Sequence, residues 1–193
     1  MKLLIDRLTA TPTPYAFEAD GEWWAERAGA DAELDHEVVD SFRFELKAHM
    51  MGSDLFLDGK LLGLIELECG RCLARYRQVL REDFQLVLEP AGDRQPLDPE
   101  AVACLERVGL CLGDDLDSGW YRGSEILLDE LFGEVIALSM PIQPVCNEGC
   151  VGLCPRCGAD RNVSVCGCEE ELKPTSPFAV LAPLREGGKG GSS

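Results

Sequence analysis

The sequence is poor in positive charge, and this shortage limits the partners that the protein can bind. Lysine and arginine together number 18 against 35 aspartates and glutamates, which gives a formal net charge of -17 at pH 7. A protein this acidic is repelled from phosphate backbones at long range. Contact with nucleic acid therefore needs a local basic patch, or a partner that supplies the positive charge, as a basic ribosomal protein would.

Long apolar runs are also missing. No run in the sequence approaches the ~18 residues that a membrane span requires. The apolar stretch from Leu3 to Ile5 is interrupted by Asp6, so it is too short for the core of a secretory signal. We therefore expect a cytoplasmic protein without a membrane partner, in a compartment where thiols stay reduced.

Histidine is scarce, and the usual catalytic motifs are lacking. The two histidines, His36 and His49, are expected to be solvated, and neither has a nucleophile or a second ligand at motif spacing. The sequence contains no glycine-rich phosphate loop. These shortages predict a protein that is not an enzyme and has no small-molecule substrate.

What is present first is a β pattern in the centre of the chain. Apolar and polar residues alternate from Phe42 to Met50, which predicts a half-buried strand. Asp58-Gly59 is typical of a hairpin turn, and further strands are expected over 60–69 and 73–88. The segment C-G-R-C, which begins at Cys69, then lies at a hairpin tip.

Two helices are expected after these strands. Asp98 and Pro99 form a helix start before residues 100–107. Apolar residues at helical spacing over 128–138 predict a second helix, which Asp129 caps and Pro141 ends. Residues 109–119 are interpreted as a loop.

The expected fold class is α+β and β-rich. It is an antiparallel meander or partly closed barrel with one or two helices and a C-terminal zinc-ribbon-like cysteine module. The predicted division is a β-rich core over 1–145, a cysteine-rich zinc-binding module docked on it over 146–172, a docking tail over 173–186 and a disordered tail over 187–193.

The ten cysteines carry the chemistry of this chain. In a cytosolic protein they favour metal binding over disulfides. C-P-R-C-G is a metal-binding knuckle, and C-G-C follows it closely. These four residues are interpreted as a zinc site, because Zn²⁺ prefers four thiolates at tetrahedral corners. The first site consists of Cys154, Cys157, Cys166 and Cys168.

A second site is expected to join distant parts of the chain. Cys146 and Cys150 are two ligands short, and Cys69 and Cys72 are the other close pair. Together they would close the long loop between Cys72 and Cys146, so a metal there would add to tertiary stability. The expected cofactor is Zn²⁺, two ions per chain. The alternative is that Cys69 and Cys72 are an ordinary buried pair.

Other roles for the cysteines remain open. Cys104 and Cys111 fit neither site and are interpreted as small buried hydrophobes. A redox role for a C-x-x-C pair is disfavoured because thioredoxin-type pairs begin a helix after a strand, whereas C-G-R-C is predicted between two strands.

A short basic stripe offers a possible RNA contact. Arg75, Arg77 and Arg81 share one face of the strand that follows C-G-R-C, and Arg71 lies within that segment. Such a stripe is able to contact RNA phosphates. A solvated strand face, or compensation of the thiolates' negative charge, explains it equally well.

Several of these motifs together resemble the YceD family, whose members are known as large ribosomal RNA subunit accumulation proteins. The resemblance rests on C-G-R-C, M-P-I-Q-P-V-C, G-L-C-P-R-C-G, C-G-C and P-F-A-V-L in this order, over roughly Leu55 to Leu184. It implies a non-enzymatic role in the synthesis, processing or stability of large-subunit ribosomal RNA. Where the family usually has Asn-Leu-Asn, this chain has Asp160-Arg161-Asn162, and the turn is expected to survive through Asn162.

The leading interpretation is therefore a zinc-stabilised ribosome-biogenesis factor that binds a large-subunit rRNA precursor or a basic ribosomal protein. Two rivals stay open: a zinc-ribbon adaptor of the transcription machinery, and a thiol redox protein.

Overall fold

The computed structural model describes residues 1–28, 36–113 and 118–168, and the chain divides after Cys150 into two compact units. The first unit is Met1–Cys150 and the second begins at Val151. The expected tails over 173–186 and 187–193 lie outside the described residues. The docking of a cysteine module on the core stays a prediction.

A six-stranded sheet forms the body of the first unit, in the order β2-β3-β4-β5-β7-β6. Only β5 and β7 run parallel; the other neighbours are antiparallel. The strands of this sheet are β2 (Thr13–Ala19), β3 (His36–Met51), β4 (Asp54–Glu68), β5 (Arg75–Pro90), β6 (Leu110–Leu112) and β7 (Ser118–Tyr121). A second, two-stranded sheet pairs β1 (Lys2–Leu4) with β8 (Glu125–Leu127). The β-rich, mainly antiparallel α+β class is thereby confirmed.

Three α-helices are present in the described chain, where one or two were expected. They are α1 (Gly21–Ala28), α2 (Pro99–Val108) and α3 (Asp129–Ser139), and a short 3-10 turn, η1, spans Ile5–Arg7. No helix in the described residues is long and apolar enough to cross a membrane. The helix α1 was missed; the side chain of Asp20 caps its start by accepting the N–H of Trp23 at 2.8 Å.

The two predicted helices differ in how they begin. In α2 the carboxylate of Asp98 accepts the N–H groups of Glu100 and Ala101, as predicted. In α3 no side chain caps the first turn. Asp129 instead accepts the indole N–H of Trp23 at 3.0 Å and a guanidinium N–H of Arg27 at 3.2 Å. The predicted capping role of Asp129 was therefore wrong.

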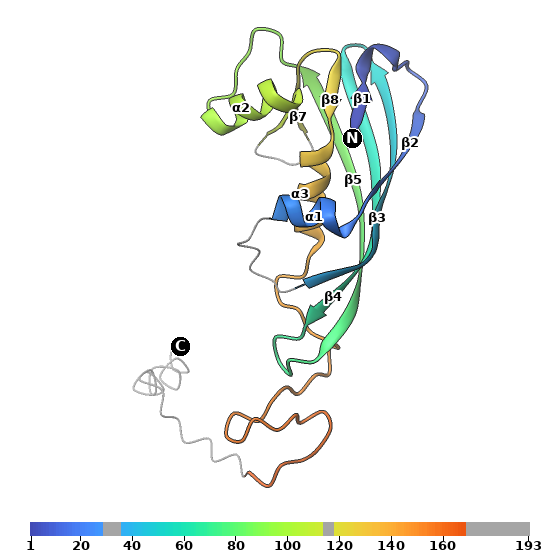
Figure 1. Ribbon diagram of the computed structural model, residues 1–193. Coiled ribbons are helices and arrows are strands. Elements are labelled where there is room, and N and C mark those ends of the chain that lie inside the picture. Colours follow the sequence, from blue (N-terminus) through green and yellow to red (C-terminus); the bar gives the residue numbers. More distant parts are fainter. Residues whose placement is uncertain (29–35, 114–117, 169–193) are drawn as a thin grey trace, which may run out of the picture. The chain divides into compact units, whose positions relative to one another are not determined.

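The core of this unit lies between the sheet and the two helices α1 and α3, which pack on the same face of it (Figure 1). Alternate residues of β3 point into it, and Phe42, Phe44 and Leu46 are at most 1% exposed. The ring of Phe132 on α3 stacks on Phe44 with centroids 3.9 Å apart. Burying each such side chain stabilises the fold by about 1.5–3 kcal/mol.

The predicted hairpin turn at Asp58-Gly59 was wrong. The strand β4 is continuous there, and Asp58 pairs with Lys47 on one side and Gln85 on the other. Gly59 is needed for close approach, because a Cβ at this position would lie 2.0 Å from the ring of Phe84. The turn between β3 and β4 is at 52–53, where Gly52 has a φ of +66°.

Three further expectations need correction. Among the residues of 109–119 that the structure describes are β6 and the start of β7; these strands are too short for alternation to reveal them. The partly closed barrel is not formed, since β2 and β6 end an open sheet within the described chain. Neither histidine is fully solvated. His36 accepts the indole N–H of Trp24, and His49 stacks on Phe56 with centroids 5.3 Å apart.

Candidate metal centres

The first cluster of cysteines forms where β4 turns into β5. The C-G-R-C segment makes this turn, and the N–H of Cys69 bonds the carbonyl of Ala74 at 3.0 Å. Leu73 adopts a left-handed φ of +61°, which tightens the turn. The N–H of Gly70 donates to the carbonyl of Pro144 at 2.9 Å, which brings the segment after α3 to the hairpin tip.

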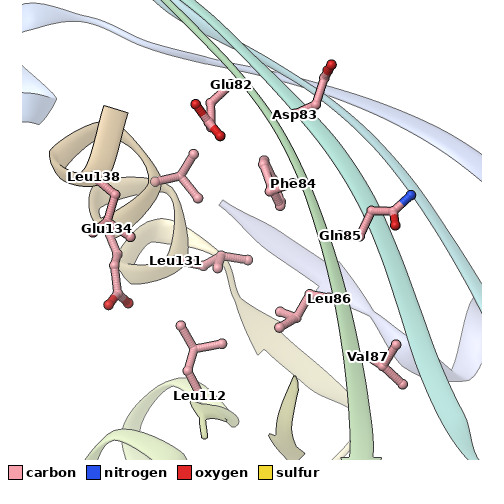
Figure 2. A pocket seen from close by; sticks show the side chains of 11 residues that line it. Glu82, Asp83, Phe84, Gln85, Leu86, Val87, Leu112, Leu131, Glu134 and Leu138 are labelled. Atoms are coloured by element: carbon pink, nitrogen blue, oxygen red, sulfur yellow. The ribbon is translucent and has the colours of Figure 1, made fainter. Parts of the chain in front are cut away.

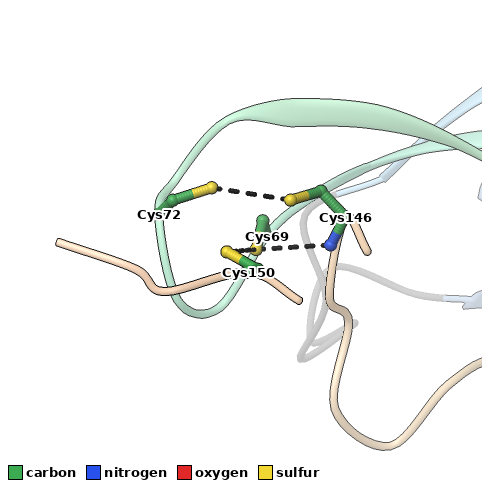
Figure 3. Close-up of side chains that lie close together, drawn as sticks. All are labelled: Cys69, Cys72, Cys146 and Cys150. Carbon is green, nitrogen blue, oxygen red and sulfur yellow. Dashed lines mark hydrogen bonds between the residues drawn. The ribbon is translucent and has the colours of Figure 1, made fainter. Parts of the chain in front are cut away.

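Two pairs of sulfur atoms meet at this tip (Figure 3). The Sγ atoms of Cys69 and Cys150 are 3.9 Å apart, and those of Cys72 and Cys146 are 3.7 Å apart. All four sulfurs lie within 4.8 Å of one another. A tetrahedron with Zn–S bonds of 2.3 Å has sulfur–sulfur edges of roughly 3.8 Å, whereas a disulfide bond is about 2.05 Å long. The spacing therefore fits four ligands of one ion, and we call these residues the hairpin cluster.

Groups around the hairpin cluster hold its sulfurs in place. The backbone N–H of Cys146 donates to Sγ of Cys69 at 3.4 Å, and the amide of Asn147 donates to Sγ of Cys146 at 3.3 Å. The guanidinium of Arg71 donates to the carbonyl of Cys150 at 3.1 Å and ties the two segments together. The spacing of the cysteines gave no signal for these supporting contacts.

The thiols of the hairpin cluster differ in their pKa values. Burial raises the pKa of the Cys69 thiol, but hydrogen bonds from backbone N–H groups, first that of Cys146, outweigh it and lower the pKa to about 6. Burial and the neighbouring thiols raise the pKa of Cys146 to about 12. Four thiolates this close repel one another, so a cation between them favours the deprotonated form of all four.

The second cluster lies in the unit that begins at Val151 and is made by local turns. Its members, the knuckle cluster, are Cys154, Cys157, Cys166 and Cys168, whose sulfurs also lie within 4.8 Å of one another. Gly158 has a φ of +73°, and its N–H donates to the carbonyl of Cys154 at 2.9 Å. Backbone N–H groups, first that of Cys157, lower the pKa of Cys154 to about 6, while the hydrogen bond with Cys157 raises that of Cys168 to about 12.

Each cluster is thus a group of four cysteines that can hold a metal ion. Four thiolates fill a tetrahedral zinc site and leave no position for a substrate, which is typical of structural sites. The other two cysteines stay outside both groups. Cys111 is buried, whereas Cys104 is only half-buried with its sulfur 3.3 Å from a carboxylate oxygen of Glu130. Burial, with Glu130, raises the pKa of Cys104 to about 11.

The comparison with known protein families decides the affiliation of the chain. The family model of "Large ribosomal RNA subunit accumulation protein YceD" matches residues 57–185. The chain belongs to the YceD family. This match has nearly the bounds of the resemblance deduced from the motifs.

Two plant proteins are among the curated relatives, both named Large ribosomal RNA subunit accumulation protein YCED homolog 1, chloroplastic. The one from Arabidopsis thaliana is 27% identical over 153 residues, which are 68% of this chain and 44% of the relative. The one from Zea mays is 30% identical over 148 residues, 68% of this chain and 48% of the relative. The chain thus spans about half the length of these relatives. No solved structure matches it.

The departure from the YceD pattern at Asp160-Arg161-Asn162 leaves the turn intact. The side-chain oxygen of Asn162 accepts the N–H of Val151 at 2.8 Å. The carboxylate of Asp160 accepts both the backbone N–H and the side-chain amide of Asn162, at 2.9 and 2.7 Å. Asp160 thus supports Asn162, which the sequence had singled out for this turn.

The arginines are not one uniform stripe. Arg75, Arg77 and Arg81 are all exposed on the face of β5 that points away from the core. Arg75 pairs with Glu66 at 2.8 Å across the sheet. Arg71 differs because its guanidinium bonds the carbonyl of Cys150. An RNA contact by these four residues stays a prediction.

Proposed function

We propose that this chain is a non-enzymatic, cytoplasmic ribosome-biogenesis factor that supports the synthesis, processing or accumulation of large-subunit ribosomal RNA. The observation that carries the proposal is its membership of the YceD family, together with the printed name of its plant relatives. It acts by binding precursor rRNA or a basic ribosomal protein, on surfaces whose shape depends on the fold around the hairpin cluster.

Zinc has a structural role in this proposal. The hairpin cluster and the knuckle cluster each bind one Zn²⁺, and the ion supplies cross-linking rather than catalysis because thiolates fill its coordination sphere. Two ligands of the hairpin cluster precede β5 in the sequence, and the other two follow α3. One ion therefore joins the hairpin tip to the segment after α3. The ion thus fixes both ends of the chain segment that runs from β5 to α3.

The function is tested by deleting the gene and measuring mature and precursor rRNA of both ribosomal subunits. We expect the ratio of large- to small-subunit rRNA to fall and to recover with the wild-type gene. Crosslinking followed by sequencing of bound RNA distinguishes the rivals. If a pulldown of the protein recovers RNA polymerase but neither large-subunit rRNA nor ribosomal proteins, the transcription adaptor is favoured and the proposal is rejected.

The metal content is tested by elemental analysis of the purified protein. We expect about two zinc ions per chain, and about one in either Cys69→Ser or Cys154→Ser. A wild-type value near one that Cys69→Ser leaves unchanged would refute the hairpin site. Thiols that stay unreactive until a chelator is added would exclude the redox rival, which requires accessible, low-pKa thiols in the native protein.

A further inference from the structure

One edge of the sheet in the first unit is largely unpaired in the described chain. The strand β5 pairs with β4 from Arg75 to Leu88, but on its other side it pairs with β7 only from Val87 to Pro90. The portion Tyr76–Leu86 has no strand partner on that side among the described residues. Such an edge presents backbone N–H and C=O groups that a further strand can pair with.

A groove runs between this edge and the helix α3. It has a volume of about 680 Å³, within the range of sites that bind small ligands or peptide side chains. Figure 2 shows Glu82, Phe84 and Leu86 of β5 pointing towards the helix, and Leu131, Glu134 and Leu138 of α3 on the opposite wall. We call this cavity, defined by these six residues, the β5 groove.

The walls of the β5 groove are apolar in their depth and acidic at their rim. Leu86 and Leu131 are buried, Phe84 is half-buried, and Leu138 is 60% exposed. The two carboxylates, Glu82 and Glu134, are exposed on opposite walls. A single exposed leucine is ordinary, but one beside an unpaired strand and an apolar floor is a position where an apolar side chain of a partner can pack.

Charge decides which occupant suits this groove. Two acidic walls in a chain of net charge -17 repel RNA phosphates, and they equally repel the same walls of a second copy. They attract lysine and arginine. Strand addition takes affinity from main-chain hydrogen bonds and specificity from alternate side chains. Glu82, Phe84 and Leu86 share one face of β5, so the partner side chains that face the groove must include both kinds. An extended segment with lysine or arginine and apolar residues together on its groove-facing side satisfies the unpaired edge, the carboxylates and the apolar floor.

We propose that the β5 groove binds an extended, lysine- or arginine-rich segment of a protein partner, which adds to β5 as an extra strand next to β7. In taking that segment to belong to a ribosomal protein, the inference rests on the proposed function. Binding of the segment itself follows from the edge and the charges alone.

The first test uses a fluorescein-labelled peptide of Lys-Thr-Val-Thr repeats, in which lysine and valine share one face of the strand. It is long enough to span the unpaired part of β5. We expect its anisotropy to report saturable binding to the full chain that weakens as salt is raised from about 0.05 to about 0.3 M. A peptide with glutamate in place of lysine should not bind. The same lysine peptide with every second residue N-methylated should bind at least about tenfold more weakly, because it cannot complete the strand.

Variants locate the site. The double variant Glu82→Lys/Glu134→Lys should bind the lysine peptide at least about tenfold more weakly. Its control is Glu26→Lys/Glu106→Lys, which changes the net charge equally at exposed positions on α1 and α2 and should bind like the wild type. Hydrogen exchange should slow over 76–86 on peptide binding and stay unchanged in β2, the strand at one end of the six-stranded sheet.

Several results would overturn the inference. One is that the groove variant and the control variant bind the lysine peptide equally well. Another is that the N-methylated peptide binds as tightly as the unmodified one. A third is that a large-subunit rRNA fragment, and no basic protein segment, displaces the peptide. Dimerisation that the groove variant abolishes would assign the groove to a second copy. Binding that appears only after deletion of 173–193 would assign it to the protein's own tail.

A cellular test separates this inference from the proposed function. If gene deletion leaves large-subunit rRNA unchanged, the proposed function fails whatever the peptide does. If deletion lowers that rRNA and the groove variant restores it as well as the control variant does, only the inference fails. We expect the groove variant, and not the control, to fail in this complementation.

Discussion

The hairpin cluster and the knuckle cluster have the same four ligand types but occupy different environments. In the hairpin cluster Cys69 is 0%, Cys150 is 4% and Cys72 is 7% exposed. In the knuckle cluster only Cys154 is buried, Cys157 is exposed, and the remaining two are half-buried. Identical chemistry is thus placed once inside the fold and once in a surface turn.

The two clusters also differ in the length of chain that they close. The knuckle ligands all lie within Cys154–Cys168, whereas the hairpin ligands are contributed by the β4–β5 tip and by the segment after α3. Cross-linking distant segments removes more conformational freedom from the unfolded chain than cross-linking near ones. We infer that metal in the hairpin cluster stabilises the first unit, and that metal in the knuckle cluster orders only its own turns.

The largest effect is expected on unfolding of the first unit. Cys69→Ser should lower its free energy of unfolding by about 3 kcal/mol or more, because the variant loses both a metal and a long-range cross-link. Cys154→Ser should change it by less than about 0.5 kcal/mol. All three tryptophans, Trp23, Trp24 and Trp120, lie in the first unit, so their fluorescence in a denaturant titration reports this unit alone.

The matched control for that experiment is Cys111→Ser, a buried cysteine of the first unit that belongs to neither cluster. Adding excess chelator should destabilise the wild type and Cys111→Ser by similar amounts and have little further effect on Cys69→Ser. If Cys154→Ser proved as destabilising as Cys69→Ser, the contrast between the clusters would be wrong.

A second effect is expected on the order of metal release. With a colorimetric chelator the zinc of the knuckle cluster should leave at least about tenfold faster than that of the hairpin cluster, because exposed turns open locally while a buried site needs a larger opening. Cys154→Ser should remove the fast phase and Cys69→Ser the slow one. A single phase in the wild type would contradict this prediction.

The sequence predicted the parts of the molecule that depend on local patterns. The helix α2 follows from Asp98 and Pro99, and the long strands follow from alternation. The pairing of Cys69 and Cys72 with Cys146 and Cys150 followed from counting ligands, and the four sulfurs do lie together. The hairpin turn predicted at Asp58-Gly59 was wrong because the sequence alone does not distinguish a glycine required beneath the ring of Phe84 from a glycine in a turn. The β5 groove was not foreseen, since an unpaired edge depends on which distant strands fail to meet.

A third effect tests the support of the hairpin cluster. Arg71→Ala removes the hydrogen-bond donor to the carbonyl of Cys150. The affinity of the hairpin cluster for metal should fall by about tenfold, since the loss of a group that positions a metal ligand typically costs about 10- to 100-fold in affinity. Competition between Co²⁺-loaded protein and a chelator, followed by the thiolate–cobalt absorption band, measures it. The control Arg77→Ala, exposed on the same strand hairpin, should leave the affinity unchanged. If both variants lost metal affinity equally, the affinity would depend on the total charge and not on this hydrogen bond.

The smallest effect is the mirror experiment in the knuckle cluster. Asn162→Ala removes the acceptor for the N–H of Val151, so metal binding by the knuckle cluster should weaken a few-fold, less than for Arg71→Ala because the turn is exposed and water replaces the lost bond. The tryptophan-monitored unfolding of the first unit should not change. Asn162→Asp, which retains the side-chain acceptor, should recover part of the affinity. If Asn162→Ala also shifted metal affinity in the hairpin cluster, the two sites would be coupled, and one ion could no longer be assigned to the body and the other to a local turn.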